Sequence, residues 1–191
     1  MLASVTTNAA TGVTTTAATL HGDLTSVGTA ASVDVGFLWG TDSGLAGATN
    51  LTHGALTAPG TYSDALSGLT PSTTYYFQAW ANGDGFSAGS ILSFTTSATY
   101  PAVTTDPASA VITTGANLNG HTTSLGTATS VTDGFLWGTS STLAAATNVT
   151  AATQTVPGAF QSGLTGMASG TTYYFEAWAN GNGFATGGIL S

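Results

Sequence analysis

Apolar and polar residues alternate along most of the chain with the two-residue period that is typical of β-strands. The period is clearest in residues 75–81, where Tyr75 and Phe77 share one face and Tyr76 and Trp80 share the other. Turn-forming residues precede this stretch, and an Asn-Gly pair follows it. We therefore predict a middle strand with a neighbouring strand on each side.

The same period predicts further strands in the first half of the chain. They are expected at residues 4–13, 18–25, 33–39, 48–56, 61–66 and 90–96. No segment has the 3.6-residue period of a helix. Roughly seven short strands separated by turn signals are typical of an antiparallel β-sandwich, so we predict an all-β fold.

The second half of the chain repeats the first at a constant offset of 98 residues. The stretch Gly36–Trp39, for example, recurs unchanged at residues 134–137, and more than half of all paired positions are identical. A single sandwich of this kind has about 100 residues, which is close to the length of each copy. We predict two tandem copies of one β-sandwich domain, at residues 1–97 and 98–191.

The middle strand and its flanks carry a family motif. The residues that form it are Leu69, Pro71, Thr73, Tyr75, Phe77 and Ala79, with Ser93–Thr96 at the close of the copy. This pattern resembles a fibronectin type III domain, most closely the Thr- and Gly-rich copies of prokaryotic surface and secreted proteins. The resemblance covers both copies, although Ser169 replaces Pro71 in the second. It implies a tyrosine corner, in which the hydroxyl of Tyr75 or Tyr173 bonds to backbone a few residues upstream.

The two copies differ at their ends. The first closes with Phe94–Thr96, whereas the second stops at Ser191, so its last strand is predicted to be short and Phe94 has no counterpart. We hypothesise that a neighbouring copy of the chain completes this strand, with its first residues in the place of Phe94. The residues of this joint would be Met1, Leu2, Ile189, Leu190 and Ser191. Such a head-to-tail joint builds open fibres when it repeats.

The composition excludes several partners. The chain has no Lys or Arg and eight acidic residues, which gives a formal net charge of −8. Binding to nucleic acid or to an anionic membrane surface needs cationic side chains, so neither partner is expected. No apolar run approaches the ~18–20 residues that span a bilayer, so no membrane insertion is expected. Because the carboxylates lack basic partners, we expect their mutual repulsion to raise their pKa values.

Three patterns resemble catalytic or metal sites, and each has a simpler structural interpretation. Residues 85–89 match the Gly-x-Ser-x-Gly string of hydrolases, but that motif needs a strand-to-helix turn and a neighbouring His. Residues 82–85, Asn-Gly-Asp-Gly, supply too few oxygen ligands for calcium. The histidines do not recur between the copies and lack the spacing of metal ligands; they are His21, His53 and His121. We therefore predict no enzymatic activity, no metal site and no cofactor.

Two N-glycosylation sequons stand at matching positions, with Asn50 and Asn148 as the acceptor residues. Both fall in a region predicted to form the edge of a sheet. A glycan there would be accessible and would block edge-to-edge pairing of strands. We predict that the chain is a glycoprotein modified at one or both of these residues.

The outward face of the middle strand predicts an exposed apolar stripe in each copy. The stripe residues are Leu38, Tyr76 and Trp80 in the first copy and Leu136, Tyr174 and Trp178 in the second. An exposed patch of this kind usually marks a contact surface. Three interpretations stay open: packing within the chain or against a glycan, packing against other copies, and stacking of sugars on the aromatic rings.

Two functions follow from these observations. The first is a non-catalytic structural module of an extracellular filament, stalk or surface layer, in which other copies of the chain are the partners. The alternative is a carbohydrate- or surface-binding adhesion module of a larger secreted protein, in which glycans are the partners. Both functions place the chain outside the cell or at the cell surface.

Overall fold

The computed structural model describes residues 1–191, the whole chain, as β-strands joined by turns and loops, with no helix. There is accordingly no helix that is long and apolar enough to cross a membrane. The chain divides into two compact units, Met1–Ser97 (unit 1) and Ala98–Ser191 (unit 2).

The strands of unit 1 are β1 (Ser4–Thr11), β2 (Ala17–Ser26), β3 (Val33–Gly40), β4 (Thr49–Leu56), β5 (Gly60–Ser67), β6 (Thr74–Asn82), β7 (Phe86–Ala88) and β8 (Leu92–Thr95). The strands of unit 2 are β9 (Ala102–Ile112), β10 (Gly115–Ser124), β11 (Val131–Gly138), β12 (Thr147–Gln154), β13 (Gly158–Thr165), β14 (Tyr174–Asn180) and β15 (Phe184–Thr186).

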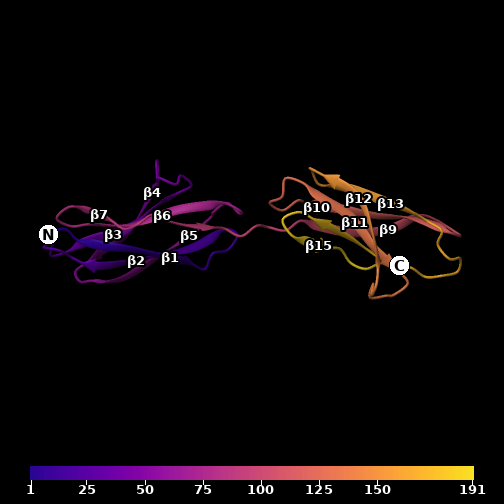
Figure 1. Cartoon of the computed structure of the whole chain (residues 1–191), viewed down its shortest axis with the longest axis horizontal. Helices are drawn as coiled ribbons and strands as arrows, with labels where there is room; N and C mark the ends of the chain where they lie inside the picture. The colour runs from indigo at the N-terminus through magenta and orange to yellow at the C-terminus, as the bar shows by residue number, and fades with distance from the viewer. The chain divides into compact units, whose positions relative to one another are not determined.

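Unit 1 consists of two antiparallel sheets (Figure 1). One sheet has the strand order β1-β2-β5, and the other has the order β4-β3-β6-β7. β8 pairs with β6 on the same edge as β7, along the first half of β6. The predicted middle strand is therefore β6, and it has strands on both sides.

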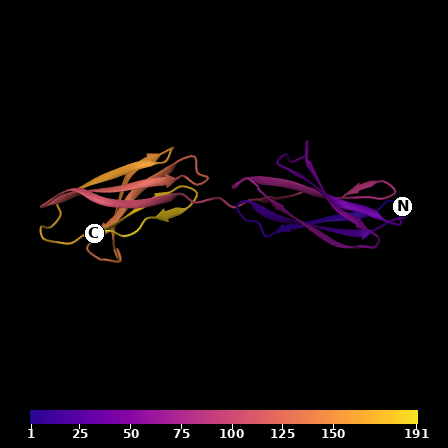
Figure 2. The same cartoon turned by 180° about the vertical axis from the view of Figure 1, so that it is seen from behind.

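Unit 2 repeats this arrangement with the sheets β9-β10-β13 and β12-β11-β14-β15 (Figure 2). The predicted all-β fold of two antiparallel sandwiches is confirmed. The order of the strands in each unit is that of a fibronectin type III-like sandwich, as the sequence resemblance implied.

The inward-facing residues of the two sheets meet in one aromatic core per unit. In unit 1, Phe37 is fully buried, with its ring centroid 5.1 Å from that of Tyr62 and 6.5 Å from that of Phe77. In unit 2, Phe135 makes the same contacts with Phe160 at 5.1 Å and Phe175 at 6.4 Å. Because alternate residues of each strand point inward, the period of the sequence leads directly to this core.

The tyrosine corner is present in both units. The backbone N–H of Thr70 donates to the hydroxyl of Tyr75 at 2.9 Å, and the N–H of Ala168 donates to the hydroxyl of Tyr173 at 3.0 Å. Each bond fixes the loop that leads into the middle strand. This prediction from the resemblance is confirmed.

The structure corrects the prediction of an exposed apolar stripe on the outer face of the middle strand. Trp80 and Trp178 are only 7 % and 5 % exposed. Trp80 lies across Gly36 of the neighbouring strand, where a Cβ atom would come within 2.7 Å of the indole. Phe86 stacks against the indole, with the ring centroids 6.3 Å apart. The indole is buried because the residue opposite it has no side chain.

The other stripe residues are half-buried; they are Leu38, Tyr76, Leu136 and Tyr174. The stripe is therefore a packed outer layer of the sheet rather than a row of exposed rings. A contact role for its remaining surface stays a prediction.

We expect Gly36→Ala to destabilise unit 1 by about 3 kcal/mol, because overpacking of a well-filled site has a cost of this order. The added methyl group would lie 2.2 Å from the carbonyl oxygen of Leu51 as well as against Trp80. Differential scanning calorimetry should show a fall of more than roughly 10 °C in the melting temperature of unit 1. The matched control is Gly40→Ala in the same strand, where the nearest atom would be at 3.7 Å. Equal melting temperatures for the two variants would contradict this explanation of the buried indole.

Candidate functional site

The clearest candidate site is the free edge of β14 in unit 2. In unit 1, β8 covers the corresponding edge of β6 with a register that runs from Phe77 opposite Leu92 to Thr74 opposite Thr95. In unit 2 only the first of these pairs exists, as a bridge between Phe175 and Leu190. The backbone hydrogen bonds of this bridge are 2.9 Å in both directions. Beyond the bridge, the edge before β14 has no strand beside it.

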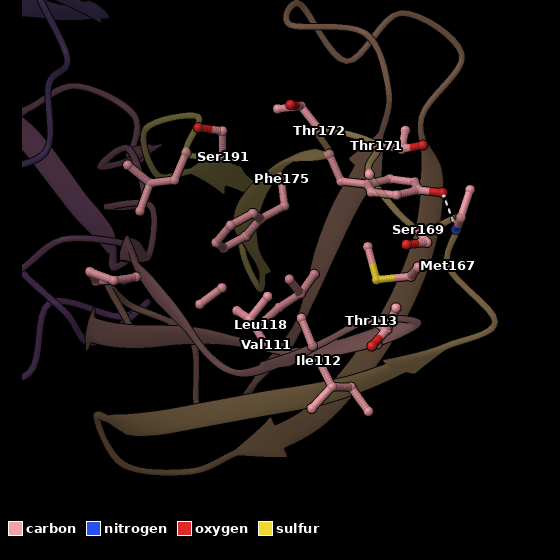
Figure 3. A pocket seen from close by; sticks show the side chains of 18 residues that line it. Val111, Ile112, Thr113, Leu118, Met167, Ser169, Thr171, Thr172, Phe175 and Ser191 are labelled. Atoms are coloured by element: carbon pink, nitrogen blue, oxygen red, sulfur yellow. Dashed lines mark hydrogen bonds between the residues drawn. The ribbon is translucent and has the colours of Figure 1, made fainter.

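A cavity of about 660 Å³ lies along this free edge, and we call it the unit 2 groove. The apolar residues that line it are Val111, Ile112, Leu118, Met167, Tyr173, Phe175 and Leu190. Figure 3 shows Phe175, Leu118 and Met167 around the opening, with Thr171 and Thr172 along one side. No side chain that lines it is charged. The groove is therefore bounded by apolar and hydroxyl-bearing side chains and by the backbone of the segment before β14.

In unit 1 the equivalent space is filled by Phe94. Its ring stacks on Tyr75 at 5.7 Å and packs against Phe77 at 5.9 Å, and it is 9 % exposed. Tyr75 is buried beneath it, whereas the counterpart Tyr173 in unit 2 is half-buried. The unit 2 groove thus lies where Phe94 packs in unit 1.

The rim of the groove exposes two large aliphatic side chains. Val111 and Ile112 are 72 % and 69 % exposed. In unit 1, Val13 at the position of Val111 packs against the core. The N–H of Ser97 also donates to the carbonyl of Thr14 at 3.0 Å, which ties this end of the first hairpin to the last strand.

The N-terminal residues are held by unit 1 itself. The backbone N–H of Thr29 donates to the carbonyl of Met1 at 3.0 Å, and the N-terminal amine donates to the Thr29 hydroxyl at 2.9 Å. Thr99 makes the same backbone contact with Thr127 in unit 2. The side chains of Met1 and Leu2 are nevertheless 89 % and 53 % exposed. Their insertion into a neighbouring copy stays a prediction, and it would require them to leave Thr29.

The other residues of the predicted joint lie beside the groove. Leu190 is half-buried in the bridge to Phe175, while Ile189 and Ser191 are exposed on either side of it. The structure thus brings Leu190 and Ser191 into the lining of the groove, and Met1 and Leu2 belong to the other unit.

A buried carboxyl group distinguishes the core of unit 2. Asp133 is 0 % exposed; its Oδ1 accepts a hydrogen bond from Thr122 Oγ1 at 2.9 Å, while its Oδ2 has no partner. Burial raises the pKa of Asp133, and the hydrogen bond from Thr122 partly opposes this shift. Unit 1 has Val35 and Leu24 in the places of Asp133 and Thr122. The strand pattern alone missed this polar pair because its members come from different sheets.

Burial also raises the pKa of Glu176. In Asp133 and Glu176 the cause is desolvation rather than the mutual repulsion that the sequence suggested, so that explanation is wrong for them. The one ion pair joins His53 Nδ1 to Asp64 Oδ2 at 3.1 Å. It occurs in unit 1 only, because unit 2 has Ala151 and Ser162 there.

The residues whose patterns resemble catalytic or metal sites lie in strands and turns, where they make structural contacts. Ser87 lies in β7 opposite Ala81 of β6, in a hairpin rather than at a strand-to-helix turn. The Oδ2 atom of Asp84 accepts a hydrogen bond from the Thr29 hydroxyl. His21 Nε2 lies 2.7 Å from the hydroxyl of Thr11. No group of three His, Cys, Asp or Glu residues is arranged to hold a metal ion.

Both predicted glycosylation residues lie on edge strands. Asn50 is exposed in β4 and Asn148 is exposed in β12, and each strand ends its sheet. Asn148 Oδ1 accepts a hydrogen bond from Trp178 Nε1 at 2.8 Å, whereas Trp80 Nε1 is buried without a partner. An N-linked sugar attaches to the amide nitrogen, so the bond to Trp178 is compatible with a glycan. Modification itself stays a prediction.

Sequence reasoning missed the exposed aromatic residues of this face. Phe86 and Phe184 are 58 % and 55 % exposed, and they stack against the two buried indoles. Beside Phe86 lies a hollow of about 290 Å³, lined by Leu38, Asn50, Trp80, Asn82 and Phe86. The signal in the sequence was an aromatic residue after the Asn-Gly turn, repeated in both copies.

Comparisons with known proteins concern the fold only. No family model and no curated protein matches the chain. A two-domain fibronectin type III segment of chicken tenascin is 15 % identical with a TM-score of 0.49, and the match covers 96 % of both chains. The sensor domain of the anti-sigma factor RsgI4 of Pseudobacteroides cellulosolvens is 22 % identical with a TM-score of 0.43. That match covers 51 % of this chain and 96 % of the sensor domain.

The buried carboxyl group predicts a pH dependence of unit 2. The folded pKa of Asp133 is raised, so folded unit 2 binds this proton more tightly than the unfolded chain does. Its contribution to stability is therefore largest below the unfolded pKa of about 3.9, and it is lost as the pH rises through the folded pKa. We expect calorimetry to show that Asp133→Val combined with Thr122→Leu removes this loss and raises the melting temperature of unit 2 at pH 7.

The matched control is Asp106→Asn, which introduces the residue that unit 1 has as Asn8. This variant should keep the pH dependence of unit 2. The account is refuted if the double variant retains the full pH dependence of the parent chain.

The sequons predict a specific change in mass. In a eukaryotic host that modifies asparagine, the secreted chain should carry an N-glycan at Asn50, at Asn148 or at both, and substitution of each occupied residue by Gln should remove one glycan. Intact-mass spectrometry before and after enzymatic deglycosylation measures this. Asn82→Gln, outside any sequon, should leave the mass of the glycans unchanged. A parent chain with no glycan in such a host would exclude the modification.

Proposed function

We propose that the chain is a non-catalytic structural module of an extracellular filament, stalk or surface layer, and that its copies join head to tail by strand addition. The observation that carries this proposal is the tandem array of two units that share one strand order. A free edge presents unpaired N–H and C=O groups, and a strand from another chain satisfies them.

Three further features support a structural role. Each unit has its own buried aromatic core, so the chain is a tandem array of self-contained modules. The Asn148 sequon lies in β12, at the opposite edge of its sheet from β14 and β15, where a glycan would leave a joint at β14 free. An array without Lys or Arg depends on backbone pairing and apolar contacts rather than on ion pairs for its assembly.

A second candidate function, adhesion to glycans, has one specific observation in its favour. The hollow beside Phe86 combines an exposed aromatic ring with the amide groups of Asn50 and Asn82. Mixed apolar and amide linings of this kind orient small polar ligands. In this alternative Phe86 and Phe184 replace the buried indoles as the binding platforms.

Electron microscopy of the purified chain at neutral pH tests the structural proposal directly. We expect regular fibres without any added partner, because a head-to-tail joint does not close on itself. Separate monomers at every concentration would overturn self-assembly. Titration with polysaccharides, monitored by tryptophan fluorescence, would then test the adhesion alternative through the rings that touch Trp80 and Trp178.

A further inference from the structure

We propose that the hollow beside Phe86 in unit 1 holds the first sugar of an N-glycan on Asn50. The sugar is an N-acetylhexosamine that packs an apolar face against Phe86, while Asn50 Oδ1 accepts a hydrogen bond from Trp80 Nε1. The inference rests on the predicted modification of Asn50. It goes beyond the proposed function because it concerns a contact within one chain and not the assembly of copies.

The acceptor residue of the sequon is itself part of the hollow. The side chains that line the hollow are those of Leu38, Asn50, Trp80, Asn82 and Phe86, and its volume is about 290 Å³. Asn50 lies opposite Leu38 in the pairing of β4 with β3, so both side chains stand on the outer face of the sheet. A sugar bonded to Asn50 Nδ2 therefore starts at the hollow, and its effective concentration there is high.

An unpaired hydrogen-bond donor marks the wall of the hollow. Trp80 is 7 % exposed, and its Nε1 atom is buried without a partner. In unit 2 the same atom of Trp178 donates to Asn148 Oδ1 at 2.8 Å. Both indoles present Cζ2 and Cε2 to the glycine opposite them, so the two rings have the same orientation. Because Nε1 is bonded to Cε2, the unpaired donor of Trp80 faces the position of Asn50.

Unit 2 shows how the asparagine satisfies this donor. The bond to Trp178 uses only the oxygen of the Asn148 amide, and the nitrogen that carries an N-linked sugar stays available. All five residue types that line the hollow recur in unit 2, as Leu136, Asn148, Trp178, Asn180 and Phe184. Asn50 can therefore adopt the same orientation. A sugar in the hollow holds the Asn50 side chain on this face, where its oxygen satisfies the buried indole nitrogen.

The chemistry of the lining matches that of a neutral sugar. Phe86 is 58 % exposed, and its ring stacks on Trp80 with the centroids 6.3 Å apart. Sugar C–H groups that cover this ring and Leu38 remove apolar surface from water. The amide of Asn82 offers both a donor and an acceptor to the hydroxyl and acetamido groups of the sugar. No side chain of the lining is charged, so the hollow suits an uncharged sugar.

The test uses the full chain with Asn148→Gln, secreted from a eukaryotic host and trimmed by an endoglycosidase to one N-acetylglucosamine on Asn50. NMR should show nuclear Overhauser effects between sugar protons and the Phe86 ring. The indole N–H proton of Trp80 should also shift relative to the unmodified chain from a bacterial host, because it gains a hydrogen bond.

A stability measurement separates a packed sugar from one that is attached but makes no contact. In calorimetry, the sugar should raise the melting temperature of unit 1 by several degrees, and Phe86→Ala should remove most of this gain. Phe86 is exposed, so its substitution leaves the core of unit 1 intact. The matched control is Phe184→Ala, the same change at the counterpart in unit 2, which should leave the gain in unit 1 unchanged.

An unmodified Asn50 in the secreted chain would overturn the inference, and so would a gain in melting temperature that Phe86→Ala leaves unchanged. Free methyl N-acetylglucosaminide that binds at Phe86, while the sugar on Asn50 makes no contact there, would overturn it in favour of the adhesion alternative. Sugar contacts at Phe86 in a chain that forms no fibres would uphold the inference and remove self-assembly. Fibres of a chain whose Asn50 sugar makes no contact would do the reverse.

Discussion

Backbone pairing along both edges of the middle strand is the constraint on which the rest of each unit depends. β6 is hydrogen-bonded to β3 on one side and to β7 and β8 on the other. This pairing places Phe77 in the core and Trp80 on the outer face, so both layers of the unit are organised from one strand. The tyrosine corner at Tyr75 then fixes the loop that enters the strand.

The two units can be compared directly because both pair strands along the two edges of the middle strand. They differ in how much of the second edge is paired. In unit 1, β8 pairs with Thr74–Phe77 and β7 with Trp80–Asn82 along the second edge of the middle strand, and Phe94 packs into the core. In unit 2 this edge is paired only from the Phe175 bridge onward. A groove of about 660 Å³ lies beside the residues that precede the bridge. Val111 and Ile112 are exposed at its rim.

The incomplete edge links the fold to the proposed function. An antiparallel sheet with a free edge attracts another strand, and natural proteins usually protect such edges. Here the opposite edges carry Asn50 and Asn148, exposed residues suited to a protecting glycan, while the β14 edge is left open beside an apolar slot. Under the proposed function, glycans at these residues would keep the opposite edge of each sheet unpaired.

The sequence by itself determined the strands, the repeat and the sandwich, because these depend on a local two-residue period and on direct alignment of the two copies. It also placed Asn50 and Asn148 at sheet edges, and it located the space left by Phe94. Tyrosine corners followed from a short motif around Tyr75 and Tyr173. All of these features are encoded within a few neighbouring residues or in the repeat itself.

Only the tertiary structure decided how side chains from distant strands meet. Trp80 is buried because Gly36 lies opposite it, and Asp133 finds its partner Thr122 across the two sheets. The groove likewise has walls from β9, β10 and the segment before β14, which are far apart in the sequence. Periodicity assigns a residue to a face of its own strand, but the burial of that face depends on the size and polarity of residues elsewhere in the chain.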